Sequence, residues 1–256
     1  MARVAPVLKE LLAERDQLRA EQHRLRAEQR RLRARIKRLR PRRDLEFVFI
    51  VTYGRSGSTL LQGILNSIPG WLIRGENAGA VYHLFQHSRA LTTRRQSHRR
   101  DQPLTSAAAW YGLDEYPRKR ARAAIRNLVV DTLLRPEPGT RVTGFKEIRW
   151  DYDDLVPYLM FLRRTFPGAR FVFNTRDHAA VAQSKWWQRA EDPRGQLEKT
   201  EDLHRTARDA LGDAAFPVHY DDYVADPSAL AGLFEWLGEE FDEERVAAVT
   251  QVRHSY

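Results

Sequence analysis

Two different hydrophobic patterns divide the sequence near residue 44. Before it, leucine recurs every seven residues, at Leu11, Leu18, Leu25, Leu32 and Leu39. After it, short runs of β-branched and aromatic residues alternate with longer stretches whose apolar residues recur at helical spacing. We therefore predict an N-terminal coiled-coil helix over residues 1–43 and a globular domain over residues 44–256.

The heptad repeat also places charged residues beside the leucine seam. With leucine at position d, glutamate at position g precedes arginine at the next position e in three pairs: Glu14–Arg19, Glu21–Arg26 and Glu28–Arg33. Such pairs meet across a parallel two-stranded coiled coil, which favours a homodimer through residues 8–39 that ends before Pro41. Two alternatives stay open. One is a single solvated helix, and the other is a basic helix that makes weak contact with an anionic surface.

The second pattern predicts an α/β domain. Short strand-like runs separated by helical stretches indicate a parallel sheet flanked by helices, because parallel strands need crossover connections. Only residues 89–116 lack a clear period, and we expect an irregular basic insertion or lid there. The predicted strands are 46–52, 142–146, 170–175 and 216–219, and the predicted helices are 58–67, 76–88, 117–134, 152–166, 177–190, 197–211, 227–237 and 242–251.

Charge and composition narrow the function classes. Residues 1–43 hold 15 Lys+Arg and 5 Asp+Glu, whereas the rest of the chain holds 28 and 29. The formal net charge of +9 therefore belongs to the N-terminal segment and does not mark the globular part as a nucleic-acid binder. The absence of cysteine excludes disulfides, thiolate metal sites and cysteine nucleophiles. No apolar run has the length of a transmembrane segment or a signal peptide, so we expect a cytoplasmic protein.

The first predicted strand leads into a loop suited to anions. Phe47–Tyr53 runs directly into Gly54-Arg55-Ser56-Gly57-Ser58-Thr59, and a helical apolar face follows. Glycines let backbone amides approach a phosphate closely, and the start of a helix favours negative charge. The alternative is an ordinary strand–helix turn with a serine cap. The lysine of a Walker A motif is missing, which counts against an ATP or GTP hydrolase.

The segment from Thr52 to Leu61 resembles the 5′-phosphosulfate-binding loop of the sulfotransferase family, in its carbohydrate- and tyrosine-sulfating style. The resemblance implies a P-loop-like fold and 3′-phosphoadenosine 5′-phosphosulfate as co-substrate. It also implies that the loop holds the 5′-phosphate and that Arg55 helps to stabilise the leaving group. The residues assigned to this site are Arg55, Ser56, Gly57, Ser58 and Thr59.

A donor with a second phosphate on its ribose needs a second anion site. Arg176 ends the predicted strand 170–175, and Ser184 follows eight residues later on the next helix. This pair is similar to the 3′-phosphate-binding pattern of the family. The alternatives are a salt bridge from Arg176 to a neighbour such as Asp177 and a surface position for Ser184. Residues 218–238 resemble the C-terminal signature of the family, and we interpret them as scaffold.

Transfer to a hydroxyl requires a base that removes the acceptor's proton. The position of Glu76 resembles that of the catalytic glutamate of tyrosine and carbohydrate sulfotransferases. Glu147 is the runner-up, in a segment where cytosolic sulfotransferases carry a histidine that this chain lacks. Lys146 is a candidate contact to the transferring sulfuryl group. The alternatives are a helix-start glutamate for Glu76 and an ion pair at a strand end for Lys146.

The sequence does not identify the acceptor of the sulfuryl group. It is a hydroxyl of a carbohydrate, a glycolipid or a phenol, and the basic loop 89–100 either contacts it, closes over the donor, or is solvated. The histidines show no metal-ligand spacing, so we expect no metal. Two other function classes remain: a nucleotide-binding kinase or hydrolase with an atypical loop, and a catalytically inactive coiled-coil scaffold.

Overall fold

The computed structural model describes residues 17, 21–22, 24–29, 31, 45–97, 104–184 and 186–251. The chain divides into two compact units, Met1–Arg43 and Asp44–Tyr256. In the first unit every described residue is helical and exposed. Leu25 is the one heptad leucine among them, and 58% of its surface is accessible in the single chain. The coiled coil and the homodimer therefore stay predictions.

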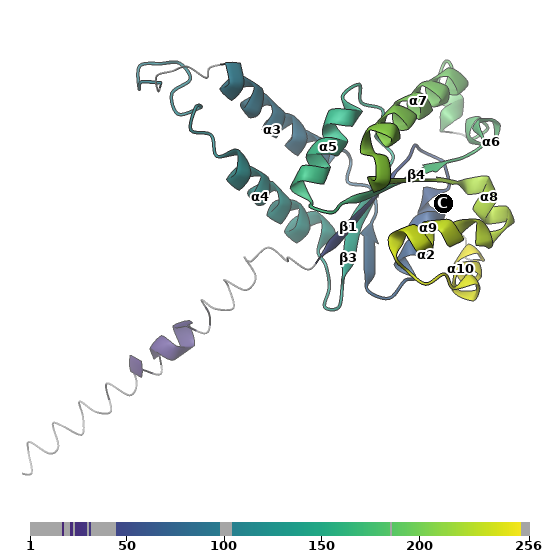
Figure 1. Ribbon diagram of the computed structural model, residues 1–256, viewed down its shortest axis with the longest axis horizontal. Helices are drawn as coiled ribbons and strands as arrows, with labels where there is room; N and C mark the ends of the chain where they lie inside the picture. The colour runs from purple at the N-terminus through teal and green to yellow at the C-terminus, as the bar shows by residue number, and fades with distance from the viewer. Residues whose placement is uncertain are drawn as a thin grey trace, which may run out of the picture. The chain divides into compact units, whose positions relative to one another are not determined.

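The second unit is built on a parallel sheet (Figure 1). Its described part contains five strands in the order β2-β3-β1-β4-β5, and every neighbouring pair is parallel. This confirms the α/β prediction. The strands are β1 (Glu46–Val51), β2 (Trp71–Arg74), β3 (Val142–Glu147), β4 (Arg170–Thr175) and β5 (Ala215–His219).

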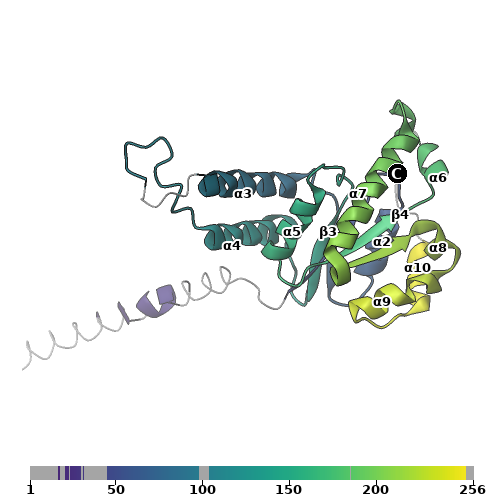
Figure 2. The same cartoon turned by 45° about the horizontal axis from the view of Figure 1, so that its top comes forward.

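Both faces of the sheet are covered by helices, as the apolar sequence of β1 requires. Phe47 and Phe49 point into a core shared with α3, α4, α5 and α7, whereas Val48 and Ile50 point into a second core shared with α2, α9 and α10 (Figures 1 and 2). All four side chains are fully buried. The helices are α2 (Ser58–Asn66), α3 (Ala80–Ser97), α4 (Arg118–Val129), α5 (Leu155–Thr165), α6 (His178–Ala182), α7 (Pro193–Leu211), α8 (Tyr220–Ala225), α9 (Ala231–Leu237) and α10 (Glu243–Thr250).

The structure departs from the sequence prediction in the basic region. Residues 89–97 are not irregular, because α3 continues to Ser97. The second half of this helix is polar and gives no clear apolar period, but α3 packs against α4 and α5, which stabilises it. Tertiary packing, which a local period does not reveal, extends the helix.

Smaller departures concern short elements. The strand list lacked β2, and the helix list lacked α8. The predicted helix 177–190 is divided into α6 and a single turn η2 (Trp187–Arg189). The predicted helix 117–134 changes after Val129 into the π-helical turn η1 (Val130–Leu134), and the predicted helix 227–237 begins as the 3₁₀ turn η4 (Pro227–Leu230). A further 3₁₀ turn, η3 (Gly212–Ala214), leads into β5.

The topology fixes where a ligand can bind. β1 lies in the middle of the sheet. The chain first forms β2 and β3 between β1 and one edge, and after β3 it crosses over to form β4 and β5 between β1 and the other edge. In such sheets ligands bind at the carboxyl ends of the strands, where the order reverses. None of the described helices is both long and apolar enough to cross a lipid bilayer.

Candidate active site

The loop between β1 and α2 has an unusual backbone. Arg55 and Gly57 both adopt positive φ angles, 70° and 76°. Gly57 caps α2 without a side-chain hydrogen bond. Among the described residues, no hydrogen bond uses the N–H groups of Gly57, Ser58 or Thr59. The loop therefore offers consecutive free donors at the positive end of a helix, which is a ready anion site.

Ser56 supports this loop from inside. Its side chain is fully buried, and its hydroxyl lies 2.6 Å from Oγ1 of Thr52. Thr52 in turn donates to the carbonyl of Asn174, and Asn174 Nδ2 donates to the carbonyl of Ser56. The Ser56 side chain faces the interior, so any contact from Ser56 to a ligand would come from its backbone amide.

Two aromatic rings pack on the glycines of the loop. A Cβ atom added to Gly54 would lie 1.4 Å from the ring of Trp186, and one added to Gly57 would lie 2.0 Å from the ring of Tyr220. Trp187 donates from Nε1 to the carbonyl of Gly54. The glycines are thus required for close aromatic packing as well as for backbone geometry.

The loop opens into a pocket of about 280 Å³. The pocket brings together most of the residues that the sequence analysis assigned to the donor and to catalysis. Its polar lining comes from the ends of four strands, β1, β2, β3 and β4, and its aromatic lining from Trp186 and Tyr220. The lining residues are Gly54, Arg55, Gly57, Ser58, Thr59, Glu76, Lys146, Ile148, Arg176, Trp186 and Tyr220.

Glu76 and Lys146 form an ion pair in this pocket. Lys146 Nζ lies 2.6 Å from Glu76 Oε1, with the lysine side chain 7% and the glutamate side chain 44% exposed. Lys146 ends β3 inside the fold, and its charge is stabilised there by Glu76. Oε2 of Glu76 has no partner among the described residues and is accessible to a second group. Both residues therefore lie where the sequence analysis expected them.

Glu147 has a different environment. It is 3% exposed, and its two oxygens accept four backbone N–H groups, from Asn77 and Gly79 on one oxygen and from Ile148 and Arg149 on the other. These bonds hold the turn that immediately follows Glu76. Glu147 does not line the pocket, so its carboxylate supports the site without facing a ligand.

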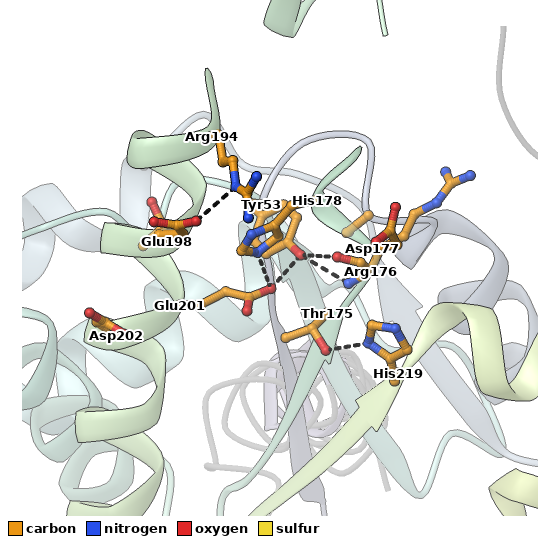
Figure 3. A network of polar contacts seen from close by, with 12 residues as sticks. Tyr53, Thr175, Arg176, Asp177, His178, Arg194, Glu198, Glu201, Asp202 and His219 are labelled. Atoms are coloured by element: carbon orange, nitrogen blue, oxygen red, sulfur yellow. Dashed lines mark hydrogen bonds and ion pairs between the residues drawn. The ribbon is translucent and has the colours of Figure 1, made fainter. Parts of the chain in front are cut away.

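A buried polar network holds Arg176 at the end of β4 (Figure 3). The hydroxyl of Tyr53 donates to Glu201 Oε1 at 2.6 Å and accepts the backbone N–H of Arg176 at 2.9 Å. Burial, together with the bond to Glu201, raises the pKa of Tyr53, so the hydroxyl keeps its proton. His178 Nε2 lies 3.0 Å from the same Glu201 oxygen.

The Arg176 side chain points toward the loop and the pocket. Its guanidinium donates to the carbonyl of Arg55 at 3.2 Å and lies 4.4 Å from the ring centroid of Tyr220. The alternative considered for Arg176 was a salt bridge to a neighbour such as Asp177. Among the described residues its ion-pair partner is instead Asp221, at 3.9 Å.

Ser184 and Ser56 are the two residues predicted to bind the sulfuryl donor that do not line the pocket. The Oγ of Ser184 is nevertheless buried and has no hydrogen-bond partner among the described residues, an unusual state for a hydroxyl. The pairing of Arg176 with Ser184 stays a prediction.

Comparison with known proteins gives this arrangement a family. The sequence profile described as "Sulfotransferase family" matches residues 48–243. The chain belongs to the sulfotransferase family. This membership indicates a transferase that moves a sulfuryl group, and it accounts for the loop, the parallel sheet and the position of the pocket. A search of curated proteins gave no match.

Solved structures show the same fold at low sequence identity. One is the sulfotransferase domain of the olefin synthase from Synechococcus PCC 7002, with TM-score 0.52 and 21% identity, covering 84% of this chain and 81% of that one. Another is the sulfotransferase domain from the curacin biosynthetic pathway, with TM-score 0.52 and 17% identity, covering 82% and 79%. At these sequence identities the structural similarity supports only the fold of this sulfotransferase.

Three residues of the pocket escaped the sequence analysis or were given another role. Tyr220 lay within a segment interpreted as scaffold, and Ile148 had no assignment. Trp186 was not among the residues assigned to the site, and the structure places it directly against Gly54. The sequence signal that could have pointed to Trp186 is the tryptophan pair Trp186-Trp187, which lies in a polar stretch soon after Arg176. Among the described residues no group of three acidic or histidine side chains is arranged to hold a metal.

Proposed function

We propose that this sulfotransferase uses 3′-phosphoadenosine 5′-phosphosulfate as donor and transfers its sulfuryl group to a hydroxyl of a small acceptor. The observation that carries the proposal is the pocket itself. Free loop amides, Arg176 and the Glu76–Lys146 pair all line the same 280 Å³ space. A base beside an anion-binding loop is what in-line transfer from a phosphosulfate to an alcohol requires.

The positively charged residues and backbone amides of the pocket each contact a different negatively charged part of the donor. The loop amides and Arg55 hold the 5′-phosphate and stabilise its charge as it leaves. Lys146 contacts the oxygens of the sulfuryl group during transfer. Arg176, together with the buried hydroxyl of Ser184, binds the 3′-phosphate, which supplies the partner that this hydroxyl lacks. The sulfuryl group of the donor is the electrophile.

Glu76 is the base in this proposal. Its Oε2 takes the proton from the acceptor hydroxyl while the new O–S bond forms and the S–O bond to the phosphate breaks. Lys146 on Oε1 orients the carboxylate. Glu147 has a supporting role in this proposal, because four backbone N–H groups already occupy its oxygens.

The first experiment measures ligand binding. Calorimetry should show binding of 3′-phosphoadenosine 5′-phosphate and little binding of ATP. Preferential ATP binding would favour the kinase or hydrolase alternative, and no binding of either would favour the inactive scaffold. A screen with labelled donor over carbohydrates, glycolipids and phenols then identifies the acceptor.

The second experiment tests the base. Glu76→Gln should keep donor affinity and lower kcat by roughly 10²–10⁴-fold, the usual range for loss of a general base. Glu115→Gln, an exposed glutamate outside the pocket, is the matched control and should leave kcat unchanged. Turnover of Glu76→Gln at the wild-type rate would contradict the proposed role.

A further inference from the structure

A second pocket lies outside the transfer site, between helices α3, α4 and α5. Figures 1 and 2 show α3 and α4 side by side, extending away from the sheet, with α5 beside their bases. The pocket has a volume of about 290 Å³, and it shares no lining residue with the transfer site. Nothing in the proposed transfer reaction uses it.

The floor of this pocket is apolar. Phe85 of α3 and Phe161 of α5 are 4% and 5% exposed, and Pro157 of α5 adds a third apolar surface. Phe85 and Phe161 pack against each other with ring centroids 5.5 Å apart. The floor therefore offers a preformed surface for an apolar or aromatic group.

The rim of the pocket is positive. Arg89, Arg118, Arg122 and Arg164 line it, contributed by all three helices. Arg89 pairs with Asp154. Within the described part of the chain, the other three arginines have no carboxylate within 4.0 Å. Guanidinium groups gathered around an apolar floor repel one another, and this cost falls when an anion neutralises them.

The local sequence makes this cost larger. Arg118, Lys119 and Arg120 occupy the first turn of α4, which contains no acidic residue. Positive charge is unfavourable at a helix N-terminus. Arg118 and Arg122 also stand four residues apart on one helix, where like charges repel each other. An anion in the pocket would relieve both effects.

We infer that this pocket, which we call the α3–α5 pocket, binds a small organic anion with a carboxylate, phosphate or sulfate head and an apolar body. The head group lies between Arg118, Arg122 and Arg164, and the body rests on Phe85 and Phe161. The inference does not depend on the identity of the sulfuryl donor or acceptor.

Three probes separate the two halves of this ligand. Decanoate combines a negative charge with an apolar chain, decanol has the chain alone, and inorganic phosphate has the charge alone. On the full-length chain, calorimetry below the micelle concentration should show decanoate binding at least tenfold tighter than either of the others. Equal affinity for decanol or for phosphate would overturn the inference.

A pair of matched double variants locates the site. R122Q/R164Q removes two charges from the rim and should weaken decanoate binding at least tenfold. R120Q/R163Q removes two charges from the same helices at residues outside the pocket and should leave the affinity within twofold. Equal weakening in both variants, or none in the first, would refute the site. Independently, a photoreactive decanoate should label peptides of α3, α4 or α5, and labelling elsewhere would also refute it.

Discussion

Glu76 and Glu147 are close in the structure but differ in what surrounds their carboxylates. Glu76 faces the pocket with one oxygen on Lys146 and the other unoccupied. Glu147 is buried, and both of its oxygens accept backbone N–H groups. From sequence both were candidate bases. The position of Glu76 resembles that of the family's catalytic glutamate, and Glu147 lies in the segment where cytosolic sulfotransferases carry a histidine. Hydrogen-bond occupancy distinguishes them.

We predict that Glu147→Gln destabilises the protein more than Glu76→Gln does. A glutamine has one acceptor oxygen and turns an NH₂ group toward N–H groups that need an acceptor, which costs about 2 kcal/mol or more of unfolding free energy. Glu76→Gln should lower it by less, because Glu76 is partly exposed and the amide oxygen of glutamine can still accept from Lys146. Urea unfolding of both variants measures the difference. Equal effects would contradict the structural role of Glu147.

His204 is a second residue whose environment is not visible in the sequence. It lies on α7, 3% exposed, stacked beside Tyr53 with ring centroids 6.4 Å apart and edge-on to Phe173 at 5.9 Å. Burial lowers the pKa of His204 to about 4, from an ordinary value of 6.5. The histidine is therefore neutral in the folded protein and becomes protonated on unfolding at mildly acidic pH.

The sign of the pH effect follows from this depressed pKa. The stabilising contribution is complete above pH 6.5 and is lost as the pH falls toward 4, because the unfolded chain binds the proton more tightly. Between pH 7.5 and pH 5 the loss amounts to about 2 kcal/mol. Urea unfolding at both pH values should show a pH dependence smaller by this amount in His204→Phe. The same dependence in wild type and variant would contradict the prediction.

At the scale of elements, the loop between β1 and α2 depends on glycine for two separate reasons. Gly57 has a φ of 76°, which an L-residue adopts with strain, and its position is in contact with the ring of Tyr220. Gly139, in the turn before β3, has a φ of 88° but open space around it. Both glycines therefore have a positive φ angle, but only Gly57 also packs against an aromatic ring.

We predict that Gly57→Ala and Gly139→Ala both lower the unfolding free energy, by about 1 kcal/mol for the backbone strain. Only Gly57→Ala should also weaken binding of 3′-phosphoadenosine 5′-phosphate, by at least about tenfold, because the added methyl displaces Tyr220 and the loop amides. Calorimetry of the two variants checks this. Unchanged affinity in Gly57→Ala would mean that the loop does not hold the ligand.

Elements differ in how well the sequence predicted them. Four of the five strands were predicted within about two residues at each end. The continuous apolar runs of β1 and β4 are typical of central strands buried on both faces. β2 was not among the strands predicted, because four residues give too short a pattern. The end of α3 was missed because its polar second half is stabilised by α4 and α5, which are distant in the chain.

At the scale of the whole molecule, residues 1–43 decide whether the protein forms a homodimer. Its heptad leucines and Glu–Arg pairs predict a parallel homodimer, and most of them lie outside the described residues. The basic residues of this segment also fit weak contact with an anionic surface. Both interpretations concern residues 1–43 and leave the sulfotransferase domain unchanged.

Sedimentation equilibrium tests the dimer. The full chain should sediment with twice its monomer mass, and a chain of residues 44–256 with its own monomer mass, because the leucine seam buries its apolar surface only when paired. Monomeric behaviour of both chains would rule out the coiled coil and leave the single helix or the surface contact. Substituting Leu18 and Leu25 by Asn in the full chain provides a control that retains the charge and length of the segment.

By itself, the sequence determined the fold class and predicted an anion-binding loop with a set of polar residues near it. These follow from local chemistry: continuous apolar strands, glycines at a strand–helix junction and an arginine at a strand end. Tertiary structure alone decided which of these residues share a pocket, because β1, β3 and β4 meet only when the sheet forms. It also turned Ser56 inward, occupied the oxygens of Glu147 and left Oε2 of Glu76 without a partner among the described residues, since contacts between distant segments leave no mark in a local pattern.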